Sequence, residues 1–293
     1  MAKTGDEGSL GTAEGAVMGR AAHALHADPP VLADTWALYL LDEDTQALVR
    51  DPAYADKPME WGDFDTSPLF ALNVGSLRYA EDEVERCVRD GIDQYVILGA
   101  GFDTFALRRG DLSDGLRVYE VDHPDVQALK RERIARAKAT PVALPTFVPV
   151  DFESTRMSDG LEASHFDPRR SSVFSWMNTI PYLSESATQA ALREITTLMA
   201  PASRIVLNYS CIVPLSDEQS AYLQTLQGKV SQSGEPLKSR FEPQAFEALL
   251  TDVGFAIIEH ATEQDLYLRY FQGRADGLNP SVPARLIVAE RRS

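Results

Sequence analysis

Two glycines, Gly99 and Gly101, follow directly on an apolar, strand-like run in the stretch YVILGAGFDTF. Glycine lets the main chain turn sharply, and it lets a ligand approach the backbone where a Cβ atom would collide with it. In open α/β sheets, nucleotide-like ligands bind at this edge, beyond the carboxyl ends of the strands. A tight turn between a strand and a helix also needs glycine, so the motif alone is weak evidence. It makes a nucleotide site a hypothesis that other residues must support.

Acidic residues follow the next two predicted strands and support this hypothesis. Asp122 ends the segment YEVD, 21 positions after Gly101, which is the spacing at which a carboxylate can accept hydrogen bonds from a ribose diol. Glu120 lies two residues earlier on the same face of the strand, so either acid could hold the sugar. The third strand ends in FVPVDF, where Asp151 could accept from an adenine amino group and Phe152 could lie against the ring. Three such features at successive strand ends rarely coincide by chance.

A nicotinamide dinucleotide is the main alternative ligand, because its binding motif also uses a glycine turn and a ribose carboxylate. That motif has a third glycine for close helix packing, whereas this chain has Thr104 at that place. The turn also brings Asp103 near the position of pyrophosphate charge, which disfavours a dinucleotide. A cationic sulfonium tolerates a carboxylate there, so these residues favour S-adenosylmethionine over NAD.

The elements that must position these residues are predicted from the spacing of apolar side chains. Residues 11–90 show helical periodicity with no convincing strand, and the stretch DPAYADKPMEWGDFDTSP among them is predicted to be a loop. From Gln94 on, short apolar strands alternate with helical stretches, which indicates a parallel sheet with crossover helices. Seven strands are predicted at 95–98, 117–121, 146–150, 172–175, 205–209, 255–260 and 285–290, with helices at 125–138, 185–199, 217–231 and 243–253. Residues 227–240, which contain two glycines and a proline, are predicted to be a mobile connection over the ligand edge.

The composition is that of an ordinary globular protein and excludes several classes. The chain has 293 residues, of which 44 are acidic and 28 basic, so its formal net charge is −16. Because a polyanion needs a basic face, this acidity argues against nucleic acid as a partner. No apolar stretch is long enough to cross a bilayer, and the first residues do not resemble a secretory signal, so a cytoplasmic location is expected. Cys87 and Cys211 lack the spacing of a disulfide framework or metal site and are expected to be reduced structural thiols.

Several motifs, in order along the chain, resemble one known family. LGAGFDTFALRR, YEVDHPDVQALKRERI, VPVDFES and FSWMNTIPYLSESA resemble the S-adenosylmethionine-dependent methyltransferases that include leucine carboxyl methyltransferase and the TcmP-like polyketide O-methyltransferases. GRAAHALHADPPVLADTWALYLL is similar to the family's helical cap, and GEPLKSRFEP and YFQGRADGL are similar to segments of its bacterial branch. The resemblance implies an α/β, Rossmann-like class I methyltransferase fold with a seven-stranded sheet, its last strand antiparallel to the rest. It further implies a cap over residues 1–90, a core over 91–293 and a lid insert around 213–240.

The resemblance also assigns cofactor contacts residue by residue. It implies that Gly99 and Gly101 hold the methionyl group and the backbone of the cofactor, that Asp122 holds the ribose, and that Asp151 with Phe152 holds the adenine.

Further cofactor contacts are implied outside the glycine turn. Arg78 stands in the helix that supplies an arginine to the cofactor carboxylate in such enzymes. The family commonly has two arginines separated by one residue, and Ser76 replaces the first here, which leaves Arg78 as the candidate and a surface ion pair as its alternative role. His123 is expected to pack near the cofactor, and Asp103 and Ser175 complete the predicted cofactor-binding set.

The acceptor side is predicted from the residues after the fourth and fifth strands. Trp176, Asn178, Tyr182 and Tyr209 are the candidate catalytic residues there, with core packing as their alternative role. Many family members have a glutamate after the fourth strand and an Asp-Tyr pair after the fifth, whereas this chain has SWMN and Asn208-Tyr209. These departures affect acceptor chemistry more than the fold. No metal is expected, because the five histidines lack zinc-ligand spacing.

The sequence therefore predicts a methyltransferase that acts on a small molecule in bacterial secondary metabolism, with oxygen as the default acceptor atom. Methyl transfer from a sulfonium is an in-line displacement, so most of the acceleration can come from holding the nucleophile about 3 Å from the methyl group in a dry site. Nitrogen or carbon methylation of an electron-rich, for example indole-like, acceptor stays open, because positions 177, 178 and 208 are altered. A non-catalytic protein that binds the cofactor is a further alternative. No nucleic acid or membrane partner is predicted, and the sequence does not determine the oligomeric state.

Overall fold

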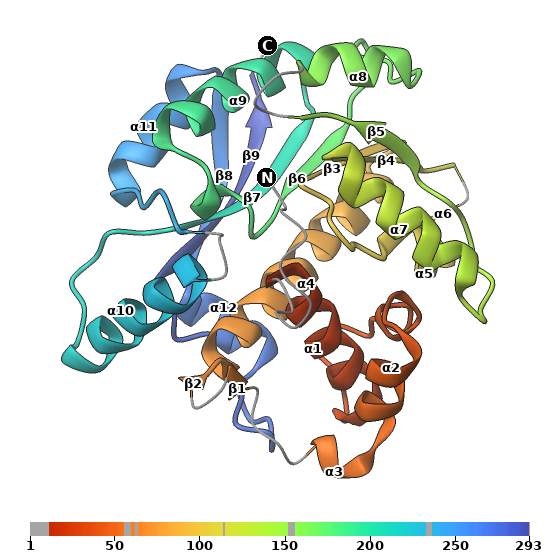
Figure 1. The fold of residues 1–293 in the computed structure, drawn as a ribbon. Coiled ribbons are helices and arrows are strands. Elements are labelled where there is room, and N and C mark those ends of the chain that lie inside the picture. The colour runs from red at the N-terminus through yellow and green to blue at the C-terminus, as the bar shows by residue number, and fades with distance from the viewer. Residues whose placement is uncertain are drawn as a thin grey trace.

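The computed structural model describes residues 12–55, 60–61, 64–113, 115–151, 156–232 and 236–292, in which helices cover both faces of a central sheet (Figure 1). The sheet has seven strands in the order β5-β4-β3-β6-β7-β9-β8. They are β3 (Gln94–Leu98), β4 (Arg117–Asp122), β5 (Thr146–Pro149), β6 (Val173–Trp176), β7 (Arg204–Ser210), β8 (Phe255–Thr262) and β9 (Ala284–Arg291). β9 runs antiparallel to both of its neighbours, and the other pairs are parallel. The predicted seven-stranded, mostly parallel sheet is confirmed.

The longer helices divide between the two faces of this sheet. α4 (Ser67–Arg89), α7 (Pro124–Arg136) and α12 (Glu263–Tyr270) cover one face, and α8 (Met157–Ala163), α9 (Glu185–Leu198) and α11 (Pro243–Asp252) cover the other. The predicted helices at 125–138, 185–199, 217–231 and 243–253 correspond to α7, α9, α10 (Asp217–Gln232) and α11 and are confirmed. The short helices α5 (Phe105–Arg108), α6 (Gly110–Ser113), α8 and α12 were not predicted, because segments of four to eight residues barely show a helical period.

Alternation of side chains along the strands explains why both faces of the sheet are covered. Leu98 of β3 packs in the core beneath α9 and α11, whereas Ile97 packs on the other face, towards α4. Strands that are buried on both faces give nearly continuous apolar runs such as YVIL. β3 and β4 are in register from Gln94 opposite Arg117 to Leu98 opposite Val121. This register brings the glycine turn after β3 level with the end of β4.

The N-terminal region consists of α1 (Thr12–His26), the 3₁₀ turn η1 (Ala37–Leu40), α2 (Glu43–Arg50) and α3 (Pro52–Ala55). Its apolar side chains pack together with Phe102 and Leu107, which follow the glycine turn. The predicted helices are present, but the predicted loop is partly wrong, because it contains α3 and the strands β1 (Glu60–Trp61) and β2 (Phe64–Asp65), which are too short to show a pattern. The boundary between cap and core at residue 90 stays a prediction. α4, just before it, packs against β6 and β7.

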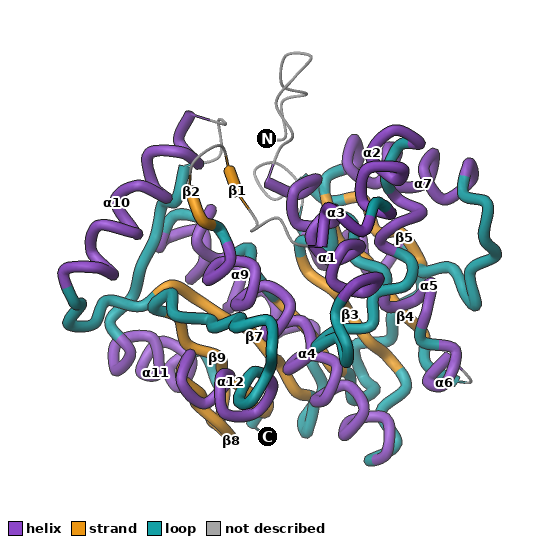
Figure 2. Tube along the Cα trace, turned by 90° about the horizontal axis from the view of Figure 1, so that it is seen from below, coloured by secondary structure: helices purple, strands orange, loops and turns teal. Residues whose placement is uncertain are grey.

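α10 lies beside β2 at one side of the molecule (Figure 2). The ring centroids of Tyr222 and Phe64 are 4.9 Å apart there. Residues 227–232 of the segment predicted to be a mobile connection belong to this helix, since one glycine inside a helical pattern is tolerated. The mobility of the segment stays a prediction. Residues 233–235 lie outside the described residues. Leu226 and Val230 are buried on the inner side of α10.

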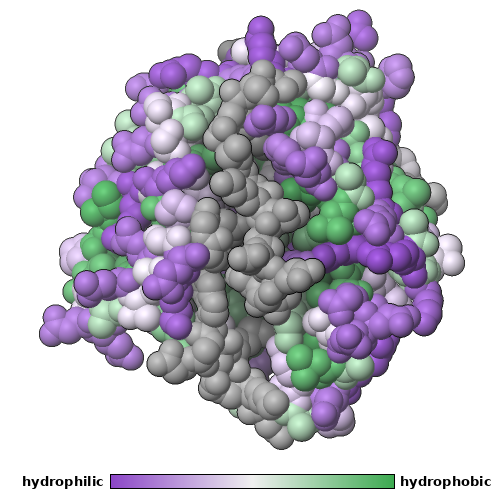
Figure 3. Space-filling model, in the orientation of Figure 1, coloured by the Kyte–Doolittle hydropathy of each residue, from purple (hydrophilic) through white to green (hydrophobic). Residues whose placement is uncertain are grey.

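Two further expectations concern the cysteines and segments that could cross a membrane. Cys87 in α4 and Cys211 after β7 are both buried and free, as predicted. Burial raises the pKa of Cys87 to about 12 and also raises that of Cys211. Hydrophilic side chains dominate the described residues on the face in Figure 3. Within the described ranges, we find no helix with the length and apolar character that a bilayer span requires.

A buried imidazole holds α1 to the segment that follows it. Nε2 of His23 accepts a hydrogen bond from the backbone N–H of Val31 at 2.8 Å, so the ring is neutral and carries its proton on Nδ1. Burial lowers the pKa of His23 to about 4, with a smaller contribution from Arg274, which the opposing charge of Asp276 reduces.

We therefore expect acid to destabilise the protein through His23. The folded-state pKa of His23 lies below the ordinary value of 6.5. The contribution of the neutral ring to the unfolding free energy is therefore complete above pH 6.5 and is lost as the pH falls towards 4. The total loss is about 3 kcal/mol. Urea titrations followed by tryptophan fluorescence should show that His23→Gln loses less unfolding free energy over this range than the wild type. His165→Asn, in the turn after α8, is the control and should behave like the wild type. Equal acid sensitivity of His23→Gln and the wild type would contradict the prediction.

Candidate functional site

A cavity of about 940 Å³ lies at the carboxyl ends of the central strands. β3 and β6 are neighbours in the sheet, and the strand order runs away from them in opposite directions, to β4 on one side and β7 on the other. Ligands bind at such a switch point in open α/β sheets. α1, α4 and α10 complete the wall. The cavity therefore lies between the sheet edge and the N-terminal helices, where the glycines and acids were predicted to meet.

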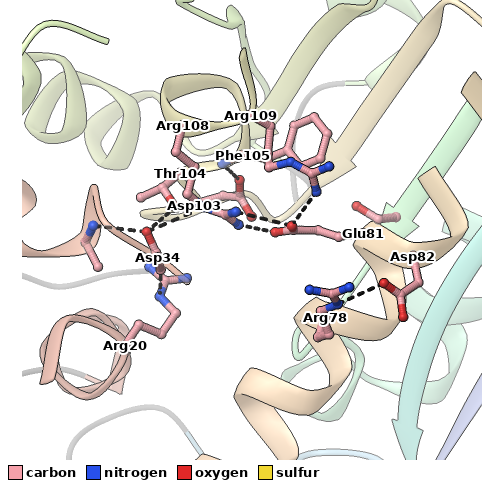
Figure 4. Close-up of polar contacts among 12 residues, drawn as sticks. Arg20, Asp34, Arg78, Glu81, Asp82, Asp103, Thr104, Phe105, Arg108 and Arg109 are labelled. Atoms are coloured by element: carbon pink, nitrogen blue, oxygen red, sulfur yellow. Dashed lines mark hydrogen bonds and ion pairs between the residues drawn. The ribbon is translucent and has the colours of Figure 1, made fainter. Parts of the chain in front are cut away.

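The structure brings most of the predicted site residues to this cavity. It is lined by Gly99, Gly101, Asp103, Asp122, His123, Asp151, Ser175, Asn178, Tyr182 and Tyr209. Two of the predicted residues are not among those that line it. Trp176 is buried in the core with Phe174, because alternate side chains of β6 face that side of the sheet. Arg78 forms a half-exposed ion pair with Asp82, with Nε 2.8 Å from Oδ1, which was its alternative role (Figure 4). Phe152 lies outside the described residues.

Tyr209 borders the cavity, but its ring belongs to the core. The ring stacks on that of Phe246 at 4.0 Å between centroids, and the residue is only 1% exposed. Its hydroxyl lies 3.0 Å from Nε2 of His260. Burial raises the pKa of Tyr209, so this hydroxyl stays protonated at neutral pH. The core-packing role that the sequence left open describes this side chain.

The two glycines differ in what surrounds them. Gly99 has a φ of +63°, and a Cβ atom there would lie 2.6 Å from the Thr179 hydroxyl, so a larger residue would displace Thr179. Gly101 has a φ of +49°, and a Cβ atom there would meet no atom within 4 Å. The space beside Gly101 is open to the cavity, which leaves room for a ligand to approach the backbone.

The carboxylate of Asp122 closes the turn from the neighbouring strand. It accepts hydrogen bonds from the backbone N–H of Gly101 at 2.5 Å and from that of His123 at 2.6 Å. Burial raises the pKa of Asp122, and these two bonds oppose the rise. A carboxylate has about four lone-pair sites, so two stay available after these bonds. Asp122 can therefore hold the turn and still accept from the hydroxyl groups of a sugar.

Glu120, the alternative sugar ligand, is engaged elsewhere. Its carboxylate pairs with Nζ of Lys130 on α7, and both side chains are 1% exposed. Burial raises the pKa of Glu120 to about 7, while the positive charge of Lys130 opposes the rise. Lys130 also acts to lower the pKa of Asp122. Asp122 is thus the acid at the end of β4 that faces the cavity.

A buried network of charged side chains joins the N-terminal helices to the glycine turn (Figure 4). Asp34 accepts from the Thr104 hydroxyl at 2.6 Å and pairs with Arg20 at 3.2 Å. Arg108 lies between Asp34 and Glu81, and its Nη1 donates to Glu81 at 3.2 Å. All five side chains are less than a tenth exposed. The network fixes the residues after the glycines relative to α1 and α4.

Arg20 is a candidate site residue that the sequence reasoning missed. Its Nη2 donates to the carbonyl oxygen of Phe102 at 2.7 Å, and the residue lines the cavity although it is only 6% exposed. In the described part of the lining, Arg20 is the buried cation that lies at the glycine turn. A guanidinium can bind a carboxylate through two hydrogen bonds, so Arg20 suits a ligand that carries a carboxylate. Nothing in the stretch GRAAHAL marked it, because one arginine in an alanine-rich helix is typical of a solvated side chain.

Two asparagines join the ends of β6 and β7. The backbone N–H of Asn178 donates to Oδ1 of Asn208 at 2.6 Å, and Nδ2 of Asn208 donates to Oδ1 of Asn178 at 2.8 Å. The Ser76 hydroxyl, on α4, donates to the same Oδ1 of Asn178 at 3.1 Å. Asn178 has a φ of +58°, a left-handed conformation that asparagine tolerates better than most residues. Three positions noted as unusual in the sequence are therefore in contact.

Comparisons with known proteins agree with this geometry. The sequence profile of the leucine carboxyl methyltransferase family matches residues 13–196. YktD of Bacillus subtilis, provisionally named an S-adenosyl-L-methionine-dependent methyltransferase, is 31% identical over 81% of this chain and 76% of its own length. A Mycolicibacterium paratuberculosis protein of the same provisional name is 32% identical over 67% of this chain and 63% of its own length. The solved structure of a provisionally assigned methyltransferase from Thermobifida fusca has a TM-score of 0.57 over 94% of both chains at 17% identity, which shows the fold alone.

Replacing Lys130 tests the ion pair behind the turn. Lys130→Met leaves Glu120 buried without its partner, which costs about 3–5 kcal/mol of unfolding free energy where the carboxylate is charged. The pKa of Glu120 is already raised from 4.5 to about 7, and it should rise further in the variant. The contribution of Glu120 to the unfolding free energy is therefore complete at low pH and is lost as the pH rises through the folded-state pKa. Urea titrations at pH 5 and pH 8 should find the variant less stable at pH 8, relative to the wild type.

Two variants serve as controls for this measurement. The double variant Glu120→Gln, Lys130→Met carries neither charge and should lack the added pH dependence. Arg136→Met removes a well-exposed pair with Glu132 on the same helix, so it should change the unfolding free energy by less than about 0.5 kcal/mol. If Lys130→Met had the same unfolding free energy as the wild type at both pH values, the buried pair would not have the assigned electrostatic role.

Proposed function

The chain belongs to the leucine carboxyl methyltransferase family and is an S-adenosylmethionine-dependent methyltransferase, and from this premise we propose that it methylates a small molecule, with oxygen as the default acceptor atom. The observation that carries the proposal is the cavity at the switch point of the sheet, which extends from the glycine turn to the ends of β6 and β7 and to α10. Its volume of about 940 Å³ lies at the upper end of the range of about 300–1,000 Å³ for small-molecule sites. The resemblance to polyketide O-methyltransferases supports bacterial secondary metabolism as the setting.

The residues around the glycine turn suit the cofactor. S-adenosylmethionine supplies an electrophilic methyl group on a sulfonium centre. Gly99 and Gly101 leave the backbone open to the methionyl group, and the open space beside Gly101 supports this role. Asp122 keeps lone pairs for the ribose hydroxyl groups, and Asp151 borders the cavity at the end of β5, where it would accept from the adenine amino group. Asp122 and Asp151 would thus anchor the adenosine moiety at separate points, the sugar and the base.

Arg20 is proposed to pair with the carboxylate of the cofactor. It is the buried guanidinium of the described lining, and Ser76 stands where the family commonly has an arginine. Asp34 and the carbonyl oxygen of Phe102 already hold the guanidinium at the turn, so little side-chain freedom is lost on binding. A hydrogen bond to a charged group contributes about 1.5–3 kcal/mol. The serine at position 76 therefore does not by itself favour a non-catalytic protein.

The acceptor half of the cavity would act by position and by exclusion of water. The acidic residues in the described lining come from α4 and from the ends of β3, β4 and β5, and they are Glu81, Asp103, Asp122 and Asp151. The wall built from β6, β7 and α10 presents amide, hydroxyl and apolar groups instead. Methyl transfer to an acceptor that is held there in line with the methyl group, in a site with little water, would need no charged side chain on this wall.

Two variants and two ligands test the cofactor assignment by titration calorimetry. Asp122→Ala should weaken both S-adenosylhomocysteine and 5′-methylthioadenosine by about 10- to 100-fold, because both ligands contain the ribose. Arg20→Met should weaken S-adenosylhomocysteine by a similar factor and leave 5′-methylthioadenosine within about twofold, because that ligand lacks the amino acid group. Retained binding of 5′-methylthioadenosine also shows that Arg20→Met is folded.

The matched control is Asp125→Ala, because the Asp125 side chain is 85% exposed one turn from Asp122. It should bind both ligands like the wild type. Unchanged affinity of both Asp122→Ala and Arg20→Met would contradict the residue assignments, and stabilisation by NADH without S-adenosylhomocysteine binding would contradict the site. Transfer itself is tested with S-adenosylmethionine labelled in the methyl group and an extract of bacterial cells. A labelled small molecule that depends on the protein is expected.

A further inference from the structure

Ser76, Asn178 and Asn208, three departures from the family pattern, form one hydrogen-bonded cluster on the cavity wall. Oδ1 of Asn178 accepts from Nδ2 of Asn208 at 2.8 Å and from the Ser76 hydroxyl at 3.1 Å. The single hydrogen of the Ser76 hydroxyl is shared with the backbone carbonyl oxygen of Asn73, which lies 3.0 Å from Oγ. The bond from Asn208 and this shared bond occupy the two lone pairs of the amide oxygen. The oxygen of Asn178 is thus directed at its protein partners and away from any ligand.

A backbone donor fixes the orientation of both amides. The N–H of Asn178 cannot be exchanged for an acceptor, and it donates to Oδ1 of Asn208 at 2.6 Å. This bond requires that the oxygen of the Asn208 amide faces the backbone and that its NH₂ group faces Asn178. The NH₂ group of Asn208 in turn requires an oxygen opposite to it. A flip of the Asn178 amide would therefore place two NH₂ groups against each other.

The remaining polar group of Asn178 is its own NH₂ group. Among the described residues, the hydrogen bonds of Asn178 use its backbone N–H and its amide oxygen, and the residue lines the cavity. Two N–H donors are therefore left for the cavity side. One turn earlier on α4 than Ser76, Oδ1 of Asn73 is a buried acceptor without a hydrogen-bond partner among the described residues, and Asn73 also lines the cavity. The wall between α4 and β6 thus offers a fixed donor next to an unused acceptor.

The proposal rests on the proposed methyltransferase function and extends it to the class of acceptor. We propose that Asn178 determines acceptor specificity by donating its amide N–H to a carbonyl oxygen of an uncharged or anionic acceptor, with Asn208 and Ser76 as positioning residues. A cationic amine is disfavoured at Asn178, because the NH₂ group there is a donor. The neighbouring Oδ1 of Asn73 is an uncharged acceptor, and the acids of the described lining lie on α4 and at the ends of β3, β4 and β5. A site built around a fixed donor discriminates strongly against an analogue that lacks the matching oxygen.

Matched acceptor probes test this proposal. The three hydroxyacetophenone isomers and the three ethylphenol isomers form pairs that differ in the carbonyl oxygen, and tyramine is the cationic probe. With labelled S-adenosylmethionine, the wild type should methylate one hydroxyacetophenone or more with a kcat/KM about 10-fold or more above that of its ethylphenol partner and above that of tyramine. If every hydroxyacetophenone were no better than its partner, the proposal would be overturned.

Two isosteric variants test the role of the cluster. Asn178→Asp keeps the acceptor for Asn208 and Ser76 but replaces the NH₂ group by an oxygen, and aspartate also tolerates a positive φ. Asn208→Asp keeps the acceptor for the backbone N–H but places an oxygen opposite Oδ1 of Asn178, which should turn that amide over. Both variants should lose the preference for the carbonyl probe, while their affinity for S-adenosylhomocysteine stays within about twofold of the wild type. A merely structural role would not change the ratio between two matched substrates.

The outcomes separate this inference from the function on which it rests. A wild type that fails to bind S-adenosylhomocysteine would overturn the proposed function and this inference with it. A wild type that binds S-adenosylhomocysteine, with Asn178→Asp retaining the carbonyl preference, would overturn the inference alone. Ser76→Ala removes one of the two donors to Asn178 and should give an intermediate ratio.

Discussion

The cavity depends on one buried set of interactions, the charged network between the N-terminal helices and the residues after the glycine turn. Burying Asp34 and Glu81 is unfavourable unless each carboxylate is paired and hydrogen-bonded, and Arg20, Thr104 and Arg108 satisfy this requirement. The network also sets the entry of the chain into α5. Asp34 pairs with both Arg20 and Arg108. Glu81 pairs with both Arg108 and Arg109. Several buried pairs together therefore hold the helices and the turn in one relative position.

The sheet and the acids at its edge could be predicted because they depend on local pattern. A strand buried on both faces gives a short apolar run, and parallel strands bring their carboxyl ends to one edge, so Asp122 and Asp151 had to lie near Gly101. Side-chain direction was harder to predict. Trp176 is next to Ser175 in β6, but alternation turns its side chain into the core. The sequence does not show which face of a doubly covered strand meets the ligand.

What the sequence could not show are contacts between distant positions. Asp34 and Thr104 are separated by 70 positions, and Ser76 and Asn178 by 102, so nothing in the local pattern marks them as partners. Arg20 was missed for this reason, since its burial comes from Asp34 and the turn rather than from its own helix. The departures from the family pattern at positions 76, 178 and 208 were visible singly. Their contact with one another was not visible, and the hydrogen bonds between them determine which polar group faces the cavity.

The two buried cysteines, finally, give a way to measure local opening of the protein. The thiolate is the reactive form, and both thiols are buried, which raises the pKa of each. Burial therefore protects both sulfurs from an alkylating reagent in the closed structure. Cys87 is a buried residue of α4, and Cys211 follows the end of β7 near the cavity. Their modification rates would therefore follow the opening of the protein at two places, the helix that bears Ser76 and the strand end that bears Asn208.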